Sequence, residues 1–147
     1  MRVDEIMTKE VHATVDDVDA EAAWHYMRKA GVRHLVVLGE RDALVGVVSD
    51  RDFAAHEAPA LARRTVRELM SPNAVVGTAD MEVGEAAKLM RDHVIGCLPI
   101  VSGAEVIGII TTMDLLTLLA GDRKVDSSTA ADPPVARGVA GGRILRR

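Results

Sequence analysis

The apolar residues of Asp19–Ala30 recur at the spacing expected of a helix that buries one face, and Gly31 is placed to end that helix. An apolar run, a turn and a β-branched run follow, which together predict a β-hairpin, and a further helix comes after them. The expected strands are Leu35–Leu38 and Leu44–Val48, and the second helix runs from about Arg51 to Glu57. The pattern thus predicts a unit with the order helix, strand, strand, helix.

A second unit with the same order follows. Its expected elements are a helix at Glu82–Asp92, strands at Cys97–Val101 and Val106–Thr111, and a helix at Thr112–Ala120. The letters repeat as well as the pattern, since Val3–Thr8 reads VDEIMT and Val66–Ser71 reads VRELMS. GVVSDRDF at Gly46–Phe53 likewise returns as GIITTMDL at Gly108–Leu115. Matched segments in one order and at nearly constant spacing indicate a duplicated unit.

The two units are expected at residues 1–60 and 61–120. Each is too small to bury a sheet alone, so the sheets should pack on each other about a pseudo-two-fold axis, in an α/β fold with two related clefts. The connection HEAPALARR at residues 56–64 is expected to be a short polar linker. Residues 121–147 are rich in Gly, Pro, Ser, Ala and Arg without any period, which predicts a flexible or disordered tail.

The composition is that of a soluble globular protein, with 48% hydrophobic residues and a net charge of -4. Because there is no basic excess and Trp24, Tyr26 and Phe53 are the aromatic residues, nucleic acid is not an expected partner. The amino terminus resembles neither a signal peptide nor a membrane span, and the single Cys97 fits a reducing cytoplasm. The histidines and the cysteine lack the spacing of metal ligands, so no metal site is expected.

Each unit carries a hydroxyl residue where a strand meets a helix, followed three residues later by an aspartate: Ser49 with Asp52, and Thr111 with Asp114. A helix amino terminus favours a phosphate, and a carboxylate in the first turn can accept hydrogen bonds from both hydroxyls of a ribose. A nucleoside phosphate would satisfy both features. The same spacing also makes a capping box that only stabilises the helix end, and the sequence leaves both interpretations open.

These repeated openings, the strands HLVV and CLPIV, and above all the motif G-h-h-S/T-x-x-D-h (h, apolar) resemble tandem cystathionine-β-synthase (CBS) repeats over about residues 1–120. The resemblance implies that Asp52 and Asp114 bind ribose and that Ser49 and Thr111 help to hold the sugar or phosphate. It also implies that Thr14 and Thr78 line the adenine pockets, and that the strand with His34, and its counterpart with Cys97 and Pro99, lie against the purine. Helix entry for the threonines and ordinary strand packing for the others are the alternatives.

The two clefts are expected to be unequal, because Arg51 in the first could reach a phosphate whereas the equivalent Met113 in the second offers no charge but can cover an apolar ring. AMP, ADP, ATP, S-adenosylmethionine, NAD and cyclic dinucleotides all contain the adenosine that the two aspartates would recognise.

No catalytic constellation is evident, so we expect a regulatory module that binds adenosine-containing nucleotides and signals to an unknown protein partner, and not an enzyme. Family analogy adds a homodimer formed through the helices, near Ala22–Ala30 and Glu82–Asp92. Two alternatives stay open: an interaction or structural protein with vestigial clefts, and an enzyme that processes nucleotides. Neither a membrane nor a metal is expected to take part.

Overall fold

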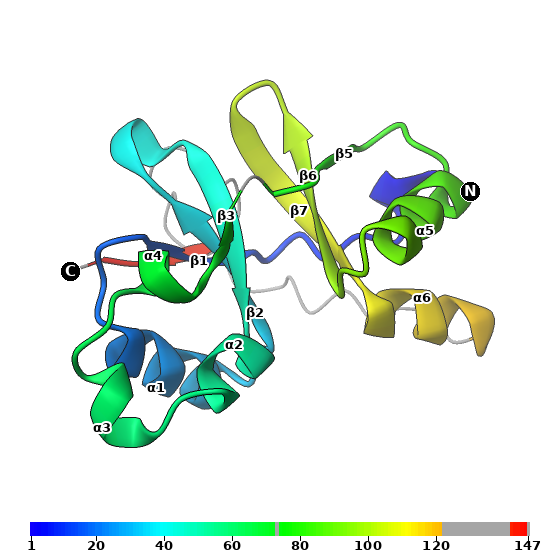
Figure 1. Ribbon diagram of the computed structural model, residues 1–147. Coiled ribbons are helices and arrows are strands. Elements are labelled where there is room, and N and C mark those ends of the chain that lie inside the picture. The colour runs from blue at the N-terminus through cyan, green and yellow to red at the C-terminus, as the bar shows by residue number, and fades with distance from the viewer. Residues whose placement is uncertain (73, 122–141, 147) are drawn as a thin grey trace.

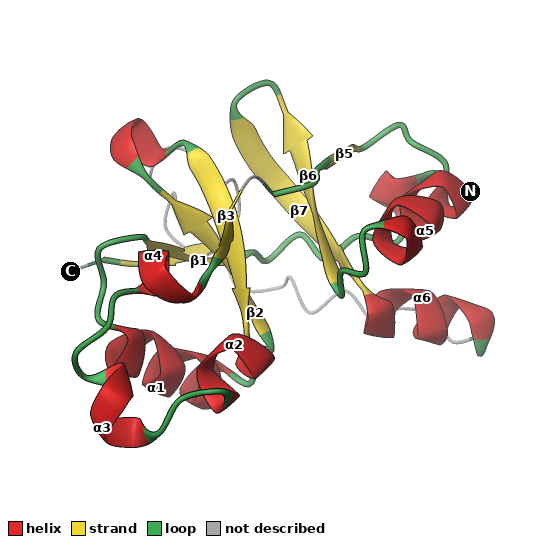
Figure 2. Cartoon of the chain, in the orientation of Figure 1, coloured by secondary structure: helices red, strands yellow, loops and turns green. Residues whose placement is uncertain are grey.

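Two β-sheets face each other at the centre of the molecule, and helices cover their outer sides (Figures 1 and 2). The computed structural model describes residues 1–72, 74–121 and 142–146. The first sheet has the strand order β4-β3-β2-β1-β8 and the second has the order β5-β6-β7. The predicted α/β architecture of two related layers is therefore confirmed.

The first repeat contains the predicted helix, hairpin and second helix. Its elements are β1 (His12–Val15), α1 (Ala20–Ala30), β2 (His34–Leu38), the 3-10 turn η2 (Glu40–Asp42), β3 (Leu44–Ser49) and α2 (Asp50–Ala54). Helix α1 buries Ala23 and Met27, one turn apart, and ends at Gly31, whose left-handed φ of 70° suits glycine. Periodicity thus located both the buried face and the end of this helix.

The second repeat has the same order. Its elements are β5 (Gly77–Thr78), α5 (Val83–Asp92), β6 (Cys97–Ser102), β7 (Glu105–Thr111) and α6 (Thr112–Leu119). The two hairpins share an irregularity, because the register of β2 against β3 shifts between Val37 and Leu38, and that of β6 against β7 shifts between Ile100 and Val101. A bulge at equivalent places is further evidence of duplication.

The opening segment of each repeat packs on the other repeat. The 3-10 turn η1 (Val3–Glu5) lies beside α5 in Figure 1, and the Val3 amide donates to the Met81 carbonyl at 2.8 Å. In the opposite direction, α4 (Val66–Leu69) and β4 (Ser71–Pro72) pack on the first repeat, where Ser71 pairs with Val47 of β3. The similar segments VDEIMT and VRELMS are therefore exchanged between the two halves, which interlocks them.

Among the described residues, the hydrophobic core consists of three clusters. One lies between the first sheet and its helices, around Phe53 and Met27, and a second lies between the second sheet, α5 and the N-terminal segment, around Leu98 and Val3. The third cluster joins the two sheets. Its buried members are Val11, Ala13, Val36, Leu38 and Val106. This inter-sheet cluster confirms that the sheets bury each other.

The connection between the repeats differs from the polar linker that the sequence suggests. It contains the short helix α3 (Ala58–Leu61), and the Leu61 side chain is buried in the first core cluster with 4% exposure. A single large apolar residue in this connection gives no periodic signal, yet burial of the Leu61 side chain holds the connection against the first core cluster.

The C-terminal tail also differs in part from its prediction. Residues 122–141 and 147 lie outside the described residues, but Arg143–Leu145 form strand β8, which pairs in parallel with β1. Without β8, β1 would be the edge of its sheet. Pairing supplies partners for the backbone groups of β1, and it lets the apolar side chains of Ile144 and Leu145 pack against the protein. These three residues are thus not part of a disordered tail.

Candidate functional site

Both motif aspartates close capping boxes at the start of a helix. In the first repeat the Ser49 amide donates to Asp52 Oδ2 at 2.8 Å, and the Ser49 hydroxyl donates to the same oxygen at 3.2 Å. In the second repeat the Thr111 amide donates to Asp114 Oδ2 at 2.8 Å, and the Asp114 amide donates to Thr111 Oγ1 at 3.2 Å. The capping interpretation therefore holds at both sites. It does not exclude ribose binding, because an ionised carboxylate has about four lone-pair sites.

The hairpin partner of each motif is a side chain that the sequence singled out. His34 pairs with Ser49 across β2 and β3, and Cys97 pairs with Thr111 across β6 and β7. The structure thus brings His34, Ser49 and Asp52 together in one half. It brings the equivalent residues Cys97, Thr111 and Asp114 together in the other half.

Burial controls the chemistry of these two side chains. It lowers the pKa of His34, although the nearby carboxylates of Asp50 and Asp52 act in the opposite direction. Burial also raises the pKa of Cys97 to about 12, with a smaller contribution from the negative charge of Asp114. The thiol is therefore protonated at neutral pH and is a poor nucleophile.

Thr8 is a site residue that sequence reasoning missed. Its hydroxyl lies 3.3 and 3.4 Å from the two carboxylate oxygens of Asp114, and its amide donates to the Ile109 carbonyl. The opening segment of the first repeat therefore meets the aspartate of the second, so the surroundings of Asp114 are built from both repeats. The signal was present in the sequence, because Thr8 and Ser71 are hydroxyl residues at equivalent places of the duplicated opening.

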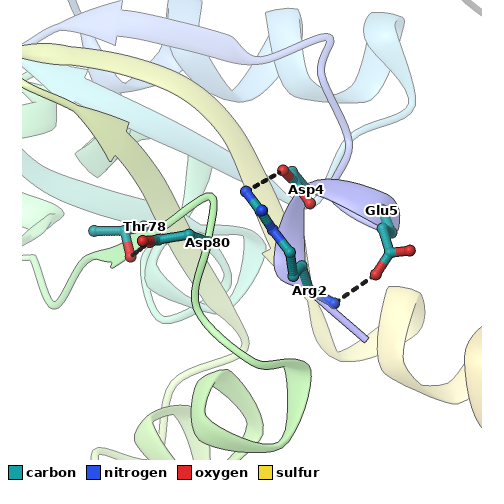
Figure 3. Close-up of polar contacts among 5 residues, drawn as sticks. All are labelled: Arg2, Asp4, Glu5, Thr78 and Asp80. Carbon is teal, nitrogen blue, oxygen red and sulfur yellow. Dashed lines mark hydrogen bonds and ion pairs between the residues drawn. The ribbon is translucent and has the colours of Figure 1, made fainter.

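Thr14 and Thr78 lie on β1 and β5, next to the hairpins and apart from the capping boxes. Thr14 is fully buried, and its hydroxyl donates to the Val15 carbonyl at 3.1 Å. Thr78 is exposed, and its hydroxyl donates to Asp80 at 2.7 Å, close to the N-terminal turn with Arg2, Asp4 and Glu5 (Figure 3). That hydrogen bond lowers the pKa of the Asp80 carboxyl.

The remaining predicted residues differ in exposure. Pro99 is buried in β6, where it pairs with Ile109 of β7. Arg51 is exposed on the first turn of α2, close enough for its charge to contribute to the lowered pKa of His34. Met113, the equivalent residue of α6, leaves 58% of its surface exposed. The predicted difference in charge between the two helix starts is thus present on the surface.

The described residues hold no group of three or more histidine, cysteine, aspartate or glutamate side chains close enough to share a metal ion. Within the same part of the chain, every helix is too short or too polar to cross a membrane.

Comparisons with known proteins find the same duplication. A family model described as "CBS domain" matches residues 3–58 and again residues 66–121. Protein MK0525 of Methanopyrus kandleri is 35% identical over 94 residues, which are 61% of this chain and 48% of that protein. The magnesium transporter MgtE of Thermus thermophilus is 29% identical over 82% of this chain, but over only 27% of its own length. The chain thus spans about half or less of these curated relatives.

Solved structures share the fold. The CBS domain pair of protein MJ0100, in complex with 5'-methylthioadenosine and S-adenosyl-L-methionine, superposes with a TM-score of 0.74 and 27% identity over 82% of this chain and 97% of that one. CBSX2 in complex with AMP superposes with a TM-score of 0.70 and 26% identity over 82% and 96% of the two chains.

Proposed function

The chain belongs to the CBS domain family, with two copies in tandem, and from this premise we propose that it is a regulatory module that binds an adenosine-containing ligand. The chain spans about half or less of these two curated relatives, so the transport activity of the magnesium transporter is not carried over to it. Binding by such a module acts by favouring one geometry of the assembly or of a partner protein over another.

The observation that carries this proposal is the pair of aspartates, each fixed at a helix start by its own capping box. The capping bonds hold each carboxylate in one orientation, so it presents its remaining acceptor sites without further ordering. Two neighbouring ribose hydroxyls would donate to such a carboxylate, and adenosine would be recognised through its sugar. AMP and S-adenosylmethionine share this sugar, and both are ligands of similar CBS pairs.

We further propose that the two clefts prefer different ligands. Asp52 lies beside the exposed guanidinium of Arg51, which suits a phosphate, whereas Asp114 lies beside Met113, which suits a ligand without phosphate charge. AMP or ATP would then favour the Asp52 cleft, and methylthioadenosine or S-adenosylmethionine the Asp114 cleft.

Two measurements test the binding proposal. Native mass spectrometry of the purified protein is expected to detect a retained adenosyl ligand. In a thermal-shift series, AMP, ATP, NAD or S-adenosylmethionine at 100 times its Kd should add about 2.7 kcal/mol to the free energy of unfolding. No retained ligand together with an unchanged Tm at millimolar concentrations would favour vestigial clefts. Depletion of ATP on incubation would instead reveal a nucleotide-processing enzyme.

A second copy of the chain is the proposed partner for the exposed apolar side of the second repeat. Met113, Leu116 and Leu119 of α6 are 58%, 52% and 82% exposed. Val94 is 91% exposed and holds a left-handed φ of 54°, where its counterpart in the first repeat is Gly31. Val94 lies near α6, because the Gly96 carbonyl accepts a hydrogen bond from Thr112 at the start of that helix. A homodimer that covers this side would bury the exposed Val94 side chain, and the contact would offset the cost of its strained backbone.

Replacing Val94 with glycine is expected to stabilise the fold of the chain and to weaken the dimer. The variant should gain about 1 kcal/mol in the free energy of unfolding, because glycine adopts positive φ without penalty. It should also dissociate at higher concentrations than the wild-type dimer in light scattering, because the apolar contact is lost. Val94→Ala keeps the strained Cβ and is the control for contact alone. A wild-type protein that is monomeric with and without nucleotide would contradict the homodimer.

A further inference from the structure

Strand β8 covers the edge of β1, the strand that carries Thr14, which the family resemblance places at an adenine pocket. It pairs in parallel with β1, placing His12 opposite Arg143, Ala13 opposite Ile144 and Thr14 opposite Leu145. The Arg143 amide donates to the Val11 carbonyl at 2.8 Å. β8 lies next to β1 near the C-terminal end in Figure 1, and it thereby occupies backbone groups that an open edge would present to another molecule.

Three anchors hold this strand. Gly142 runs so close to β1 that a Cβ atom there would overlap the Val11 carbonyl oxygen. Ile144 packs against the inter-sheet cluster, together with Val106 and Ile109 of the second repeat. The Arg146 guanidinium binds Asp42 at 3.0 and 3.1 Å, and the Asp42 side chain is only 16% exposed. The pairing of β8 with β1 is therefore specific to this sequence, because it depends on a glycine, an apolar residue and an arginine at these three places.

The two repeats differ at this edge. In the first repeat Thr14 is fully buried beside Leu145, whereas Thr78, its counterpart in the second repeat, is exposed. In the part of the chain that the structure describes, no strand pairs with the outer edge of β5. The duplicated fold therefore has one covered edge and one open edge.

Two features connect the covered edge of β1 with Asp114. Thr8 contacts Asp114 and lies a few residues before the start of β1, while Ile144 and Ile109, on the strand that ends at Thr111, both pack against the inter-sheet cluster. A purine next to this aspartate could extend along the edge of β1, where its ring nitrogens and amino group would bond the same N–H and C=O groups that β8 uses.

We propose that residues 142–146 are an intramolecular strand that competes with the adenosyl ligand for the edge of β1 and so closes the Asp114 cleft selectively. The proposal rests on the proposed function, because it names the regulation of that site. The strand is tethered to the domain, so it rebinds at a high effective concentration. If the edge is covered about nine-tenths of the time, the apparent affinity of this cleft is about tenfold weaker than its intrinsic affinity. The Asp52 cleft stays open.

Gly142→Ala tests the proposal, because the added methyl group expels the strand without changing β1. Gly84→Ala is the matched control, since a Cβ at Gly84 meets no atom within 4 Å. In hydrogen exchange without ligand, the Ala13 amide, which points towards β8, is expected to exchange at least about tenfold faster in Gly142→Ala than in the wild type or in Gly84→Ala, whereas the Thr14 amide on the β2 side should change less. Arg146→Ala, which removes only the ion pair, should give a smaller increase.

Calorimetric titration with S-adenosylmethionine and with AMP then measures the ligand affinity of each cleft. Gly142→Ala is expected to bind about tenfold more tightly at one of two sites, with the other site unchanged. Equal affinities in the wild type and Gly142→Ala, with faster exchange in the variant, would overturn the competition and leave the proposed function intact. If no ligand binds to either protein, the proposed function fails, and with it the competition, while the exchange data still show whether β8 covers β1. Unchanged exchange rates in Gly142→Ala would contradict the claim that β8 covers the edge of β1.

Discussion

Replacing Gly46 with alanine is expected to lower the free energy of unfolding by about 3 kcal/mol, at the upper end of typical overpacking costs. A Cβ at this position would lie 2.5 Å from the Ser71 carbonyl oxygen and 2.9 Å from Met70 Sδ. The Ser71 carbonyl belongs to β4, which pairs with β3, so it cannot move away without breaking the exchange between repeats. Chemical denaturation should show a lower midpoint with an unchanged m-value.

The chain provides two internal comparisons for this substitution. At the equivalent Gly108 a Cβ would lie 2.6 Å from Met7 Sδ, the end of a flexible side chain, and 3.1 Å from the Thr8 carbonyl oxygen. Gly108→Ala should therefore cost less than Gly46→Ala. Gly84→Ala on α5 should be neutral or stabilising by up to about 1 kcal/mol, because alanine favours a helix. An equal cost at all three positions would show that crowding by the exchanged segments is not the cause.

This comparison also explains the glycine of the repeated motif in physical terms. Gly46 and Gly108 begin the stretch G-h-h-S/T-x-x-D, and the sequence identified them as part of a pattern without a reason. The structure supplies the reason, since Met70 of one opening segment and Met7 of the other cross directly over them. Sequence periodicity describes neighbours along the chain, and these neighbours come from the opposite repeat.

The same distinction separates what could be predicted of the fold from what could not. The helix at Ala20–Ala30 and the hairpin strand at Leu44–Ser49 follow from local spacing, and their observed ends lie within one residue of the predicted ones. The partners of Leu61, Ile144 and the opening segments are distant in sequence. A short apolar segment without a period could not indicate which surface would bury it.

At the candidate site, sequence reasoning found the residues that repeat and missed the contact between repeats. The paired motifs predict Asp52 and Asp114 together with their caps, and the structure shows the capping boxes, while ribose binding stays a prediction. Thr8 was missed because its contact with Asp114 spans most of the chain. Whether the predicted residues bind a ligand is a question of chemistry, which variants that spare the caps can answer.

Replacing Asp52 with asparagine is expected to weaken AMP binding at the open cleft by roughly 30-fold, while the fold is retained. The asparagine oxygen can still accept the Ser49 amide, which now donates to Asp52 Oδ2 at 2.8 Å, so α2 keeps its cap. What is lost is the charge, and each hydrogen bond from a ribose hydroxyl to a carboxylate is stronger than one to a neutral amide by about 1 kcal/mol. Calorimetry measures the affinity, and denaturation should show less than about 1 kcal/mol of change in stability.

Asp50→Asn is the matched control, because it removes the same charge from the adjacent residue, which takes no part in the capping box. It should leave AMP affinity within about threefold, since an unbonded charge acts only through screened Coulomb forces.

Asp114→Asn gives the second comparison. With S-adenosylmethionine as the ligand, Asp114→Asn should weaken binding by a similar factor in the wild type and in the Gly142→Ala background, because competition by β8 changes the apparent affinity by a constant factor. Gly142→Ala should then tighten binding about tenfold both with Asp114 and with Asn at that position, and no gain from Gly142→Ala in either case would contradict the competition. The same titrations thus separate the role of the aspartates from the role of the strand.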